Sequence, residues 1–397
     1  MEKFVGIIGA GTMGSGIALA AAQSGCSVSI YDNNETVLAT AMERLRSGLV
    51  ERVSKGRLSQ KEYAETLARL KPTTAFRSLG LCDVVVEAIA EKLDVKREVF
   101  KAMSDITAEQ TLLASNTSAL SIGAIAAGCK FPERILGMHF FNPAPVMKLV
   151  ELVSGINTSD LTLVRAKEFV NGLGKESVVC RDTPAFIVNR IARNFYGESL
   201  RIAGEGTATP AEIDAIMREV GKFKMGPFEL MDFIGIDVNY TVTQDVYNAY
   251  FQEPRFRPHQ MQRTLFESGR LGRKSGQGFY DYTGGKASPK IPVGAGQVAA
   301  AKAVFEQSEK TFFLNKDAVF ARVLAMIINE AMFAVQEDIA SEPDIDLAMK
   351  LGTNYPAGPI EWGRAIGFEK IHGVLRALHA EFQDERYKAA PLLKIYA

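Results

Sequence analysis

The sequence predicts an α/β fold with a doubly wound, mostly parallel sheet, followed by two tandem all-α domains. Three observations lead to this prediction. Short apolar runs alternate with helical segments over residues 4–153. A glycine-rich turn, GAGTMG, joins the first apolar run to the first helix. Beyond residue 182 the strand pattern gives way to helical stretches, and two of these stretches resemble each other.

The first strand, turn and helix form a dinucleotide-binding pattern. Residues 4–8 (FVGII) are continuously apolar, as in a parallel strand covered on both faces, and residues 16–25 form a small-residue helix with a glycine stop. The first glycine of the turn permits the tight bend, the second lets the backbone approach a pyrophosphate, and the third allows close helix–strand packing. The diphosphate rests on the helix N-terminus. The predicted cofactor contacts here are Gly9, Gly11, Thr12, Met13 and Gly14.

The next strand predicts which dinucleotide binds. It has the sequence SVSIYD and ends at Asp32, eighteen residues after Gly14. An acidic residue at this position binds the ribose 2′-hydroxyl and repels a 2′-phosphate. The residues that follow, Asn33 to Glu35, offer no arginine to receive such a phosphate. We therefore expect a Rossmann-like domain that binds NAD rather than NADP.

The remaining elements of the first domain follow in order. Residues 35–70 read as two charged helical segments joined around VSKGRLSQ. Strands are expected at 82–89, 111–116, 134–141 and 147–153, with helices at 91–106 and 118–128. Ligands of such sheets bind outside the carboxyl ends of the strands. The residues at those ends are Asp32, Ser115 to Ser118, and His139 with Asn142.

His139 and Glu151 are the candidate catalytic pair. His139 stands at a strand end, and Glu151 lies in the apolar stretch LVELV of the next strand, where an unpaired charge would be costly. A glutamate partner fixes the imidazole tautomer and raises its basicity. Imidazole titrates close to neutral pH, so it suits the removal of a hydroxyl proton. The alternative is a core histidine bonded to a backbone carbonyl.

Composition excludes several classes. The chain has 46 basic and 46 acidic side chains, which gives no sign of nucleic-acid binding. The four cysteines (Cys26, Cys82, Cys129, Cys180) are far apart, so neither a disulfide scaffold nor a metal site is expected. The N-terminus enters the first strand at once, and no apolar run of membrane-spanning length is evident. We expect a cytoplasmic enzyme without a membrane partner.

The chain resembles the 3-hydroxyacyl-CoA dehydrogenase family in seven stretches that keep the family's order and spacing. They are GAGTMG, VVVEAIAEKLDVK, SNTSALSI, GMHFFNPAPVMKLVELV, TPAFIVNRI, GPFELMDFIGIDV and LGRKSGQGFYDY, from residue 5 to residue 282. The resemblance implies an NAD-dependent oxidoreductase of fatty acid β-oxidation. Such an enzyme oxidises a (3S)-3-hydroxyacyl-CoA to the 3-ketoacyl-CoA, or reduces a substrate such as acetoacetyl-CoA.

The resemblance also implies residue roles. His139 is similar to the family's catalytic base and Glu151 to its partner. Ser118 is similar to the residue that binds the substrate 3-oxygen beside the nicotinamide, and Asn189 to the asparagine that helps polarise the substrate. The implied cofactor contacts are Glu91, Lys96, Ser118, Asn142 and Lys274, and Lys55 is similar to a lysine that contacts the CoA moiety.

Each role has a plainer alternative. Ser118 could cap the helix expected to begin near Leu120, which is compatible with a catalytic role. Asn189 could be an exposed polar residue near the start of a helix. Lys55, with Arg52, Arg57 and Lys61, could form a solvated helix face, although the phosphates of CoA require some such cluster.

Residues 183–245 match the residues 132 positions later without a gap. The matched pairs are Arg190/Arg322, Glu198/Glu330, Glu205/Glu337, Ile213/Ile345, Asp214/Asp346, Met217/Met349, Gly226/Gly358, Pro227/Pro359, Glu229/Glu361 and Gly235/Gly367. We predict an NAD-binding domain at 1–182, a helical domain at 183–283, a linker with a short helix at 284–314, and a degenerate second helical copy at 315–397.

The second copy has lost one implied site residue, because Asn189 corresponds to Ala321. Simple members of the family dimerise through the helical domain. The second copy is therefore expected to take the partner's place within one chain, as a monomeric pseudo-dimer. The alternative is a new interface in a homo-oligomer.

Two rival functions stay open. One is oxidation of a small free 3-hydroxy acid, as in the family's lambda-crystallin relative; the basic residues around Lys55 argue against it. The other is a non-catalytic, NAD-binding structural protein. Such a protein has no need to keep Ser118, His139, Glu151 and Asn189 together.

Overall fold

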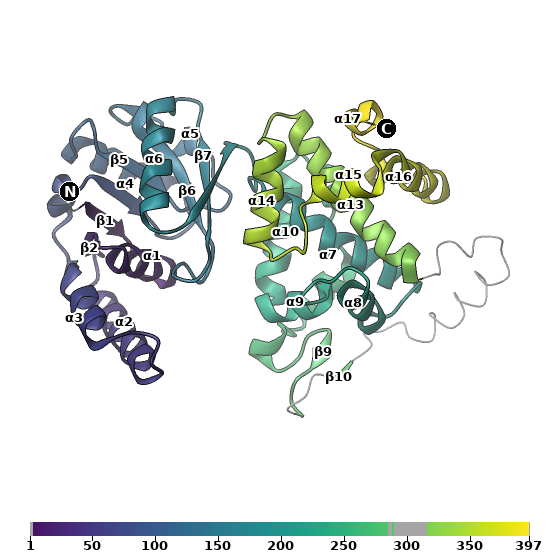
Figure 1. Cartoon of the computed structure of the whole chain (residues 1–397), viewed down its shortest axis with the longest axis horizontal. Helices are drawn as coiled ribbons and strands as arrows, with labels where there is room; N and C mark the ends of the chain where they lie inside the picture. The colour runs from purple at the N-terminus through teal and green to yellow at the C-terminus, as the bar shows by residue number, and fades with distance from the viewer. Residues whose placement is uncertain (1–2, 285–287, 290–315, 397) are drawn as a thin grey trace. The chain divides into compact units, whose positions relative to one another are not determined.

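The computed structural model describes residues 3–284, 288–289 and 316–396 (Figure 1). It forms two compact units, Met1–Phe186 and Ile187–Ala397. The boundary between them falls four residues beyond the predicted end of the first domain at residue 182. The short helix expected around 297–309, within the predicted linker, lies outside the described residues.

The first unit is built on an eight-stranded sheet in the order β3-β2-β1-β4-β5-β6-β7-β8. Neighbouring strands are parallel except for β6 and β7, which are antiparallel. This confirms the predicted doubly wound, mostly parallel sheet. The strands are β1 (Phe4–Ile8), β2 (Ser27–Tyr31), β3 (Leu70–Thr73), β4 (Val84–Glu87), β5 (Leu112–Ser115), β6 (Ile135–Phe140), β7 (Leu149–Ser154) and β8 (Glu176–Arg181).

Two of these strands were not predicted. The edge strand β3 has the sequence LKPT, which offers no apolar run and contains a proline. Proline lacks an N–H donor and is tolerated at a sheet edge. The other edge strand, β8, alternates between exposed and buried residues. The sequence signal is weakest at edge strands because only part of such a strand is covered.

Helices connect the strands of the first unit. They are α1 (Thr12–Gln23), α2 (Glu35–Ser54), α3 (Gln60–Arg69), η1 (Phe76–Leu81), α4 (Leu93–Ile106), α5 (Ile122–Ile125), η2 (Pro132–Arg134) and α6 (Asp160–Gly172). The side chain of Asn34 accepts the N–H groups of Thr36 and Val37 at the start of α2. Ser59 and Glu62 form a capping box at the start of α3. The two predicted helices between residues 35 and 70 therefore begin at sequence-encoded caps.

The second unit is largely helical (Figure 1). We call residues 187–282 the first helical segment: α7 (Val188–Gly204), α8 (Pro210–Glu219), α9 (Pro227–Ile234), α10 (Ile236–Ala249), η3 (Pro254–Phe256), α11 (Gln260–Glu267), η4 (Arg273–Ser275) and β9 (Tyr280–Asp281). β9 pairs with β10 (Ser288–Pro289). The second helical segment is residues 316–396: α13 (Lys316–Gln336), α14 (Glu342–Gly352), α15 (Pro359–Ile366), α16 (Phe368–Phe382), η6 (Glu385–Tyr387) and α17 (Pro391–Tyr396).

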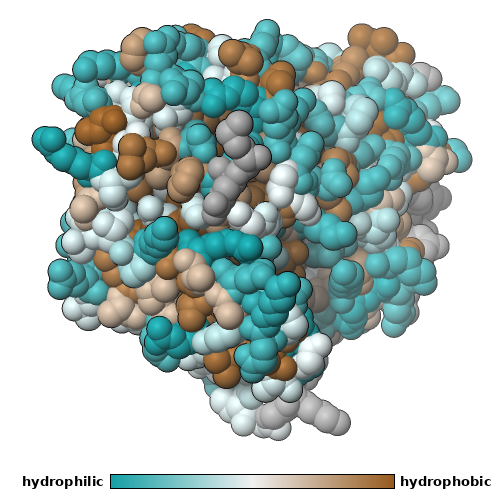
Figure 2. Space-filling model, turned by 60° about the vertical axis from the view of Figure 1, so that its left-hand side comes forward, coloured by the Kyte–Doolittle hydropathy of each residue, from teal (hydrophilic) through white to brown (hydrophobic). Residues whose placement is uncertain are grey.

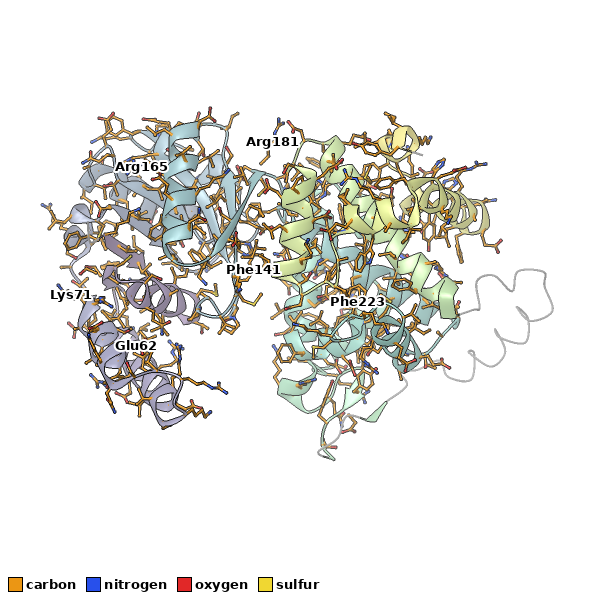
Figure 3. All side chains as sticks on the ribbon, viewed as in Figure 1. Glu62, Lys71, Phe141, Arg165, Arg181 and Phe223 are labelled. Atoms are coloured by element: carbon orange, nitrogen blue, oxygen red, sulfur yellow. The ribbon has the colours of Figure 1, made fainter. Side chains whose placement is uncertain are left out.

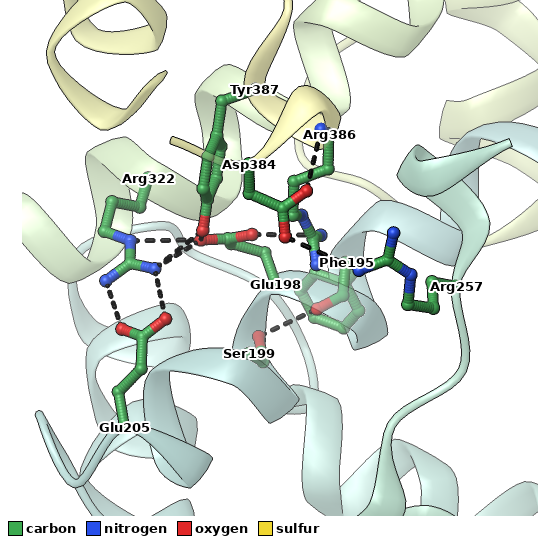
Figure 4. A network of polar contacts seen from close by, with 9 residues as sticks. All are labelled: Phe195, Glu198, Ser199, Glu205, Arg257, Arg322, Asp384, Arg386 and Tyr387. Atoms are coloured by element: carbon green, nitrogen blue, oxygen red, sulfur yellow. Dashed lines mark hydrogen bonds and ion pairs between the residues drawn. The ribbon is translucent and has the colours of Figure 1, made fainter. Parts of the chain in front are cut away.

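The matched charged residues bind across the two segments. Arg190 on α7 lies 2.7 Å from Glu330 on α13 and 2.7 Å from Glu337, the residue that follows this helix. In return, Arg322 on α13 lies 2.7 Å from Glu198 and 2.8 Å from Glu205 (Figure 4). Each arginine thus pairs with two glutamates of the other segment, and the two pairs of glutamates occupy matched positions. Such an exchange is the mark of a two-fold, self-complementary interface, here formed within one chain.

Smaller features of the two segments also correspond. The carboxylate of Asp214 accepts the N–H groups of Phe228 and Glu229, each at 2.9 Å. That of Asp346 accepts those of Ile360 and Glu361, which lie 132 positions later, at 2.7 and 3.1 Å. The segments also meet at matched aromatic residues, since the ring of Phe223, labelled in Figure 3, lies 5.0 Å from that of Tyr355. The similarity in sequence therefore extends to local structure.

One expectation about apolar runs was wrong. Among the described residues one helix, α13, is long and apolar enough over Ala318–Gln336 to cross a membrane, by length and composition. However, 78% of that window is buried inside the structure, and its two charged residues, Arg322 and Glu330, are both ion-paired. These are the properties of a core helix. On the face shown in Figure 2, hydrophobic residues occur in small groups among hydrophilic ones.

Candidate active site

The predicted site residues of the first unit gather at one edge of the sheet. β1, β2, β4, β5 and β6 run parallel to one another, so their carboxyl ends share an edge. Gly9, Asp32, Ser115 and His139 lie at or next to those ends, and so does Glu87, which was not predicted. The parallel order of these strands thus brings distant segments of the chain to one place.

His139 and Glu151 form a buried pair. The antiparallel register of β6 and β7 sets them directly opposite each other, and the Nδ1 atom of His139 lies 2.7 Å from Oε2 of Glu151. His139 is 7% exposed and Glu151 is fully buried. Because Nδ1–H donates to the carboxylate, Nε2 is the nitrogen left to exchange a proton. The predicted base and its partner are therefore in contact.

Aromatic side chains enclose the imidazole. The ring of Phe141 lies 4.6 Å from that of His139 and the ring of Phe186 5.8 Å from it (Figure 3). Ala185 and Phe186 both adopt left-handed backbone conformations with φ of 65° and 50°, which L-residues rarely take. Both are buried, so packing holds this strained pair in place.

The glycine turn has the geometry of a diphosphate site. Gly9 has a φ of 99°, and any Cβ at Gly14 would lie 1.8 Å from the Gly9 carbonyl oxygen. These two positions therefore require glycine. At Gly11, by contrast, a Cβ would meet nothing within 4 Å, so its open face is available to a ligand. Helix α1 begins at Thr12 without a side-chain cap, which leaves its first N–H groups to bind an anion.

Asp32 is held beside this turn. Its Oδ2 atom accepts the N–H of Ala10 at 3.0 Å and its Oδ1 atom that of Asn34 at 3.1 Å. A pocket of about 440 Å³ opens here. It is lined by Ile8, Gly9, Gly11, Tyr31, Asp32, Asn33, Val37, Phe76, Ala88, Ile89, Ala90, Val95 and Val99. Apolar walls with one carboxylate suit an adenosine, whose base is flat and whose ribose carries hydroxyls.

Glu91 binds the loop that carries Ser118. Its Oε1 atom accepts the Thr117 hydroxyl at 2.5 Å and the Ser118 N–H at 2.9 Å. Its Oε2 atom lies 3.1 Å from Nζ of Lys96. Burial raises the pKa of Glu91, but the charge of Lys96 and these hydrogen bonds outweigh it, so the net shift is downward. Glu91 is therefore ionised at neutral pH.

Lys96 is paired with Glu87, a buried residue that the sequence did not lead us to predict as part of the site. Its side chain is 1% exposed, and Nζ lies 2.7 Å from Oε1 of Glu87, which is fully buried. Glu87 also accepts the N–H of Ile89 and the hydroxyl of Ser115, each at 2.7 Å. The signal was present in the sequence, since Glu87 ends the apolar run VVVE and a buried carboxylate needs partners.

The helix-cap alternative for Ser118 was wrong. Helix α5 begins at Ile122, and its cap is Ser121, whose side chain accepts the N–H of Ala124. Ser118 is only partly buried and its hydroxyl lies 3.5 Å from Glu91. In the same loop, the side chain of Asn116 accepts the N–H of Phe140 at 2.9 Å, which ties this loop to the end of β6. Asn142, beyond β6, is exposed.

Asn189 and Lys274 belong to the helical unit. Asn189 is the second residue of α7 and is partly exposed, and its carbonyl oxygen accepts Nε of Arg193 at 3.0 Å. The Nζ atom of Lys274 lies 2.6 Å from Oδ2 of Asp237. Burial raises the pKa of Asp237 and the Lys274 hydrogen bond lowers it, with a net downward shift.

The predicted basic cluster is reorganised in the structure. Lys55 is exposed at the end of α2 and pairs with Glu51. Arg52 and Arg57, together with Arg69 of α3, line a pocket of about 340 Å³ instead. The pocket also contains Glu62 and Glu65, so its charge is mixed. Arg69, at the end of α3, was not predicted as part of this cluster.

Two domains of one known enzyme match this chain. The NAD-binding domain of 3-hydroxyacyl-CoA dehydrogenase matches residues 4–183, and the C-terminal domain of that enzyme matches residues 186–282 and again 319–397. The second domain description thus applies to both helical segments. No group of three or more His, Cys, Asp or Glu side chains that could hold a metal occurs in the described part of the chain.

Individual relatives agree. The chain is 39% identical to 3-hydroxyadipyl-CoA dehydrogenase of Escherichia coli K12, over 98% of this chain and 96% of the relative. It is 40% identical to 3-hydroxybutyryl-CoA dehydrogenase of Bradyrhizobium diazoefficiens, over 72% of this chain and 98% of that protein. The crystal structure of 3-hydroxybutyryl-CoA dehydrogenase from E. coli K12 superposes with a TM-score of 0.89 at 38% identity, covering 100% of this chain and 98% of that one. The chain belongs to the NAD-dependent 3-hydroxyacyl-CoA dehydrogenase family.

Proposed function

We propose that this protein oxidises (3S)-3-hydroxyacyl-CoA thioesters to 3-ketoacyl-CoA, and catalyses the reverse reduction. The observation that carries the proposal is the buried contact between His139 and Glu151 at the carboxyl edge of the sheet. The Glu151 carboxylate stabilises the imidazolium that forms when Nε2 accepts the 3-hydroxyl proton. The C3–H bond breaks with its electron pair as the C3–O double bond forms. NAD, when bound, supplies the acceptor for that hydride.

The residues at the glycine turn fit NAD. The first N–H groups of α1, at Thr12 and Met13, face a turn whose open position is Gly11, which suits a diphosphate. The carboxylate of Asp32 suits the 2′-hydroxyl of the adenosine ribose and repels a 2′-phosphate. Asn142 and Lys274 are proposed as further cofactor contacts, on the family resemblance. Glu91 and Lys96 are proposed to act on the nicotinamide side of the same site.

Ser118 and Asn189 are proposed to act on the substrate oxygens. A hydroxyl from Ser118 and an amide from Asn189 would stabilise the polarity that develops at the 3-oxygen and the thioester carbonyl. The Ser118 loop is fixed for such a role, since Glu91 holds its backbone and Asn116 ties it to β6. Arg193 holds the carbonyl of Asn189 in the first turn of α7.

For the CoA moiety we propose the basic face of α2 and α3. Lys55 with Arg52 and Arg57 offers cations to the phosphates, as a substrate with several anionic groups requires. The acyl group is a separate question, because the two relatives above are described as acting on a dicarboxylic and on a short-chain acyl-CoA. The assay therefore includes both kinds.

We propose that the helical region arose by duplication and that the second helical segment fills the place of a dimer partner. The exchanged ion pairs of Arg190 and Arg322 support this, as does a relative that matches only 72% of this chain but is itself covered to 98%. A light-scattering mass of one subunit supports the monomeric pseudo-dimer. A mass of two or more subunits contradicts it and favours a homo-oligomer. We also propose a cytoplasmic location.

The first test follows NADH absorbance on mixing the protein with acetoacetyl-CoA. Parallel runs use NADPH in place of NADH, free acetoacetate, and a dicarboxylic 3-ketoacyl-CoA. We expect oxidation of NADH with a thioester only. Turnover of free acetoacetate at a comparable rate would favour the small-acid rival, and binding of NADH without turnover of any substrate would favour the structural protein.

The second test replaces the base. His139→Asn should reduce kcat by roughly 10²- to 10⁴-fold, because proton transfer loses its acceptor. The dissociation constant of NADH, from its fluorescence, should stay within about twofold of the unmodified protein, since His139 is proposed to act on substrate rather than cofactor. Unchanged kcat would contradict the assignment. The matched control is His379→Asn, a half-exposed histidine of the second helical segment, which should leave kcat unchanged.

A further inference from the structure

Beneath the Ser118 loop lies a buried cluster of three charges. Lys96 sits between two carboxylates, 2.7 Å from Glu87 and 3.1 Å from Glu91. Lys96 is 1% exposed and Glu87 is fully buried, whereas the Glu91 side chain is 40% exposed. Water therefore screens Glu87 and Lys96 far less than it screens surface charges.

The cluster carries an excess negative charge. Two carboxylates and one ammonium sum to a net charge of −1. The neighbours of both carboxylates are donors: Ile89 N–H and the Ser115 hydroxyl for Glu87, the Thr117 hydroxyl and Ser118 N–H for Glu91. For Glu91, the charge of Lys96 and these donors together lower the pKa despite burial. The charge is thus built into the fold rather than left to a mobile surface side chain.

The cluster is one hydrogen bond from Ser118, whose N–H lies 2.9 Å from Glu91. The inference rests on the proposed function, which puts Ser118 beside the nicotinamide. The nicotinamide ring is positively charged in NAD⁺ and neutral in NADH. A fixed charge next to the ring therefore acts on one redox form and not on the other.

We propose that the Glu87–Lys96–Glu91 cluster shifts the relative affinity of this site toward NAD⁺ and away from NADH, through its net negative charge beside the nicotinamide. Glu87 and Lys96 are positioning residues in this scheme, because their buried heads act through Glu91 and the Ser118 loop. Tighter binding of the oxidised form stabilises the cofactor product of ketone reduction. On the enzyme, the equilibrium is displaced toward the 3-hydroxyacyl thioester.

The test is the ratio of two dissociation constants, that of NAD⁺ over that of NADH, measured by calorimetry. Glu87→Gln keeps the shape of the side chain and removes one negative charge. We expect the ratio to rise roughly three- to tenfold. Glu91→Gln should raise it in the same direction, and its more exposed position keeps the test available if the Glu87 variant does not fold. The dissociation constant of ADP-ribose, which lacks the nicotinamide, should be unchanged in Glu87→Gln.

Two further variants separate charge from structure. Glu87→Gln combined with Lys96→Met removes one charge of each sign, so the net charge returns to −1 and the ratio should return to that of the unmodified protein. Ser115→Ala removes a hydrogen bond to Glu87 without changing any charge, and should leave the ratio unchanged. A structural role alone would instead weaken NAD⁺, NADH and ADP-ribose together.

A ratio that stays within twofold in both charge-removing variants overturns the proposal, as does equal weakening of all three ligands. Failure of the proposed function looks different. In that case the unmodified protein shows no binding of NAD⁺ or NADH, or no thioester-dependent turnover. If it binds both and turns over substrate while the ratio does not move, only the charge proposal fails.

Discussion

The two helical segments share a scaffold but differ in what they bury. In the first, Arg193 is buried and donates to the carbonyl of Asn189 and to the Thr243 hydroxyl, while the carboxamides of Gln262 and Asn239 are also in contact. At the corresponding positions the second segment has Ala325, Ile371 and Leu375 in place of Arg193, Asn239 and Thr243. A buried guanidinium without a carboxylate is costly. This group of buried polar side chains holds the turn that bears Asn189, and the second segment has apolar residues at the matched positions.

A second difference concerns Asp232. In the first segment its carboxylate accepts the N–H groups of Phe279 and Tyr280 and the Tyr282 hydroxyl, all at 3.0 Å. These bonds fasten the loop that carries Lys274. The corresponding residue of the second segment is Arg364, which is exposed and pairs with Glu342. The shared features include the ion pairs that join the segments, and the divergent ones surround residues proposed to contact the substrate or the cofactor.

The largest expected effect comes from the shared features. Arg190→Met leaves Glu330 and Glu337 without this cation, and Arg322→Met does the same to Glu198 and Glu205. Each should lower the free energy of unfolding by about 2–3 kcal/mol, because a buried carboxylate loses one of its two guanidinium partners. Glu330 keeps Arg255 and Glu198 keeps Arg386, each at 3.0 Å. Urea unfolding followed by circular dichroism measures it. If the segments are equivalent as a scaffold, the two variants should agree to within about 1 kcal/mol.

The matched control is Arg263→Met, which breaks an exposed pair with Glu267 one helical turn away. Such pairs contribute about 0.3–0.5 kcal/mol. A loss of unfolding free energy below about 1 kcal/mol in either buried-arginine variant would contradict the interpretation that these ion pairs hold the two segments together.

The next largest effect is expected on kcat, and it tests the difference between Asn189 of the first segment and Ala321 of the second. Asn189→Ala should reduce kcat by roughly 10²-fold, since one donor to the developing charge is lost. The reciprocal change, Ala321→Asn, puts the amide into the second segment and should leave kcat unaltered. Steady-state kinetics with acetoacetyl-CoA measures both. Equal losses from the two variants would show that position 189 acts on stability rather than on the reaction.

The smallest effect is pH-dependent and concerns Asp214. The pKa of Asp214 is raised to about 7, and burial is the largest cause. Hydrogen bonds, first among them the one from the Tyr280 hydroxyl at 2.6 Å, offset part of this rise. Since an unfolded aspartate has a pKa of about 3.9, the folded state holds this proton more tightly. The resulting stabilisation is complete below about pH 4 and is lost as the pH rises to about 7.

Tyr280→Phe removes a donor that favours the ionised form, and so raises the pKa of Asp214 further. The free energy of unfolding should fall by about 1–2 kcal/mol at pH 8 and by less at pH 5, where the carboxyl is protonated in the folded state. Tyr396→Phe, which removes an exposed hydroxyl from Glu342, should have little effect at either pH. A loss for Tyr280→Phe that is larger at pH 5 would reverse the assigned sign. Asp346 accepts the two corresponding backbone donors, those of Ile360 and Glu361, so the variant makes Asp214 resemble it.

Most of the first unit could be predicted from the sequence, because apolar runs and the glycine turn are local signals. The approach of His139 to Glu151 could be anticipated from two short strands in succession, although their antiparallel register is visible only in the structure. The edge strand β3 could not be found, since Lys71 and Pro72 hide it. Glu87 was overlooked for another reason. Its partners Lys96 and Ser115 lie 9 and 28 residues away, and only the sheet brings them together.

The reciprocal pairing of the helical segments was likewise beyond a sequence comparison. Matching Arg190 with Arg322 showed that the segments are alike, but not that each arginine pairs with glutamates of the other segment. A repeat reveals similarity within a chain. Which copy contacts which is decided by packing.

Because both halves of this interface belong to one chain, its formation is unimolecular. The tether sets a high effective concentration, so dilution does not separate the halves as it separates two subunits. A single chain also frees each half to change alone. In a homodimer, any substitution appears on both sides of the two-fold axis at once. Here position 189 is asparagine and the matched position 321 is alanine, a difference between the two sides that a homodimer could not have.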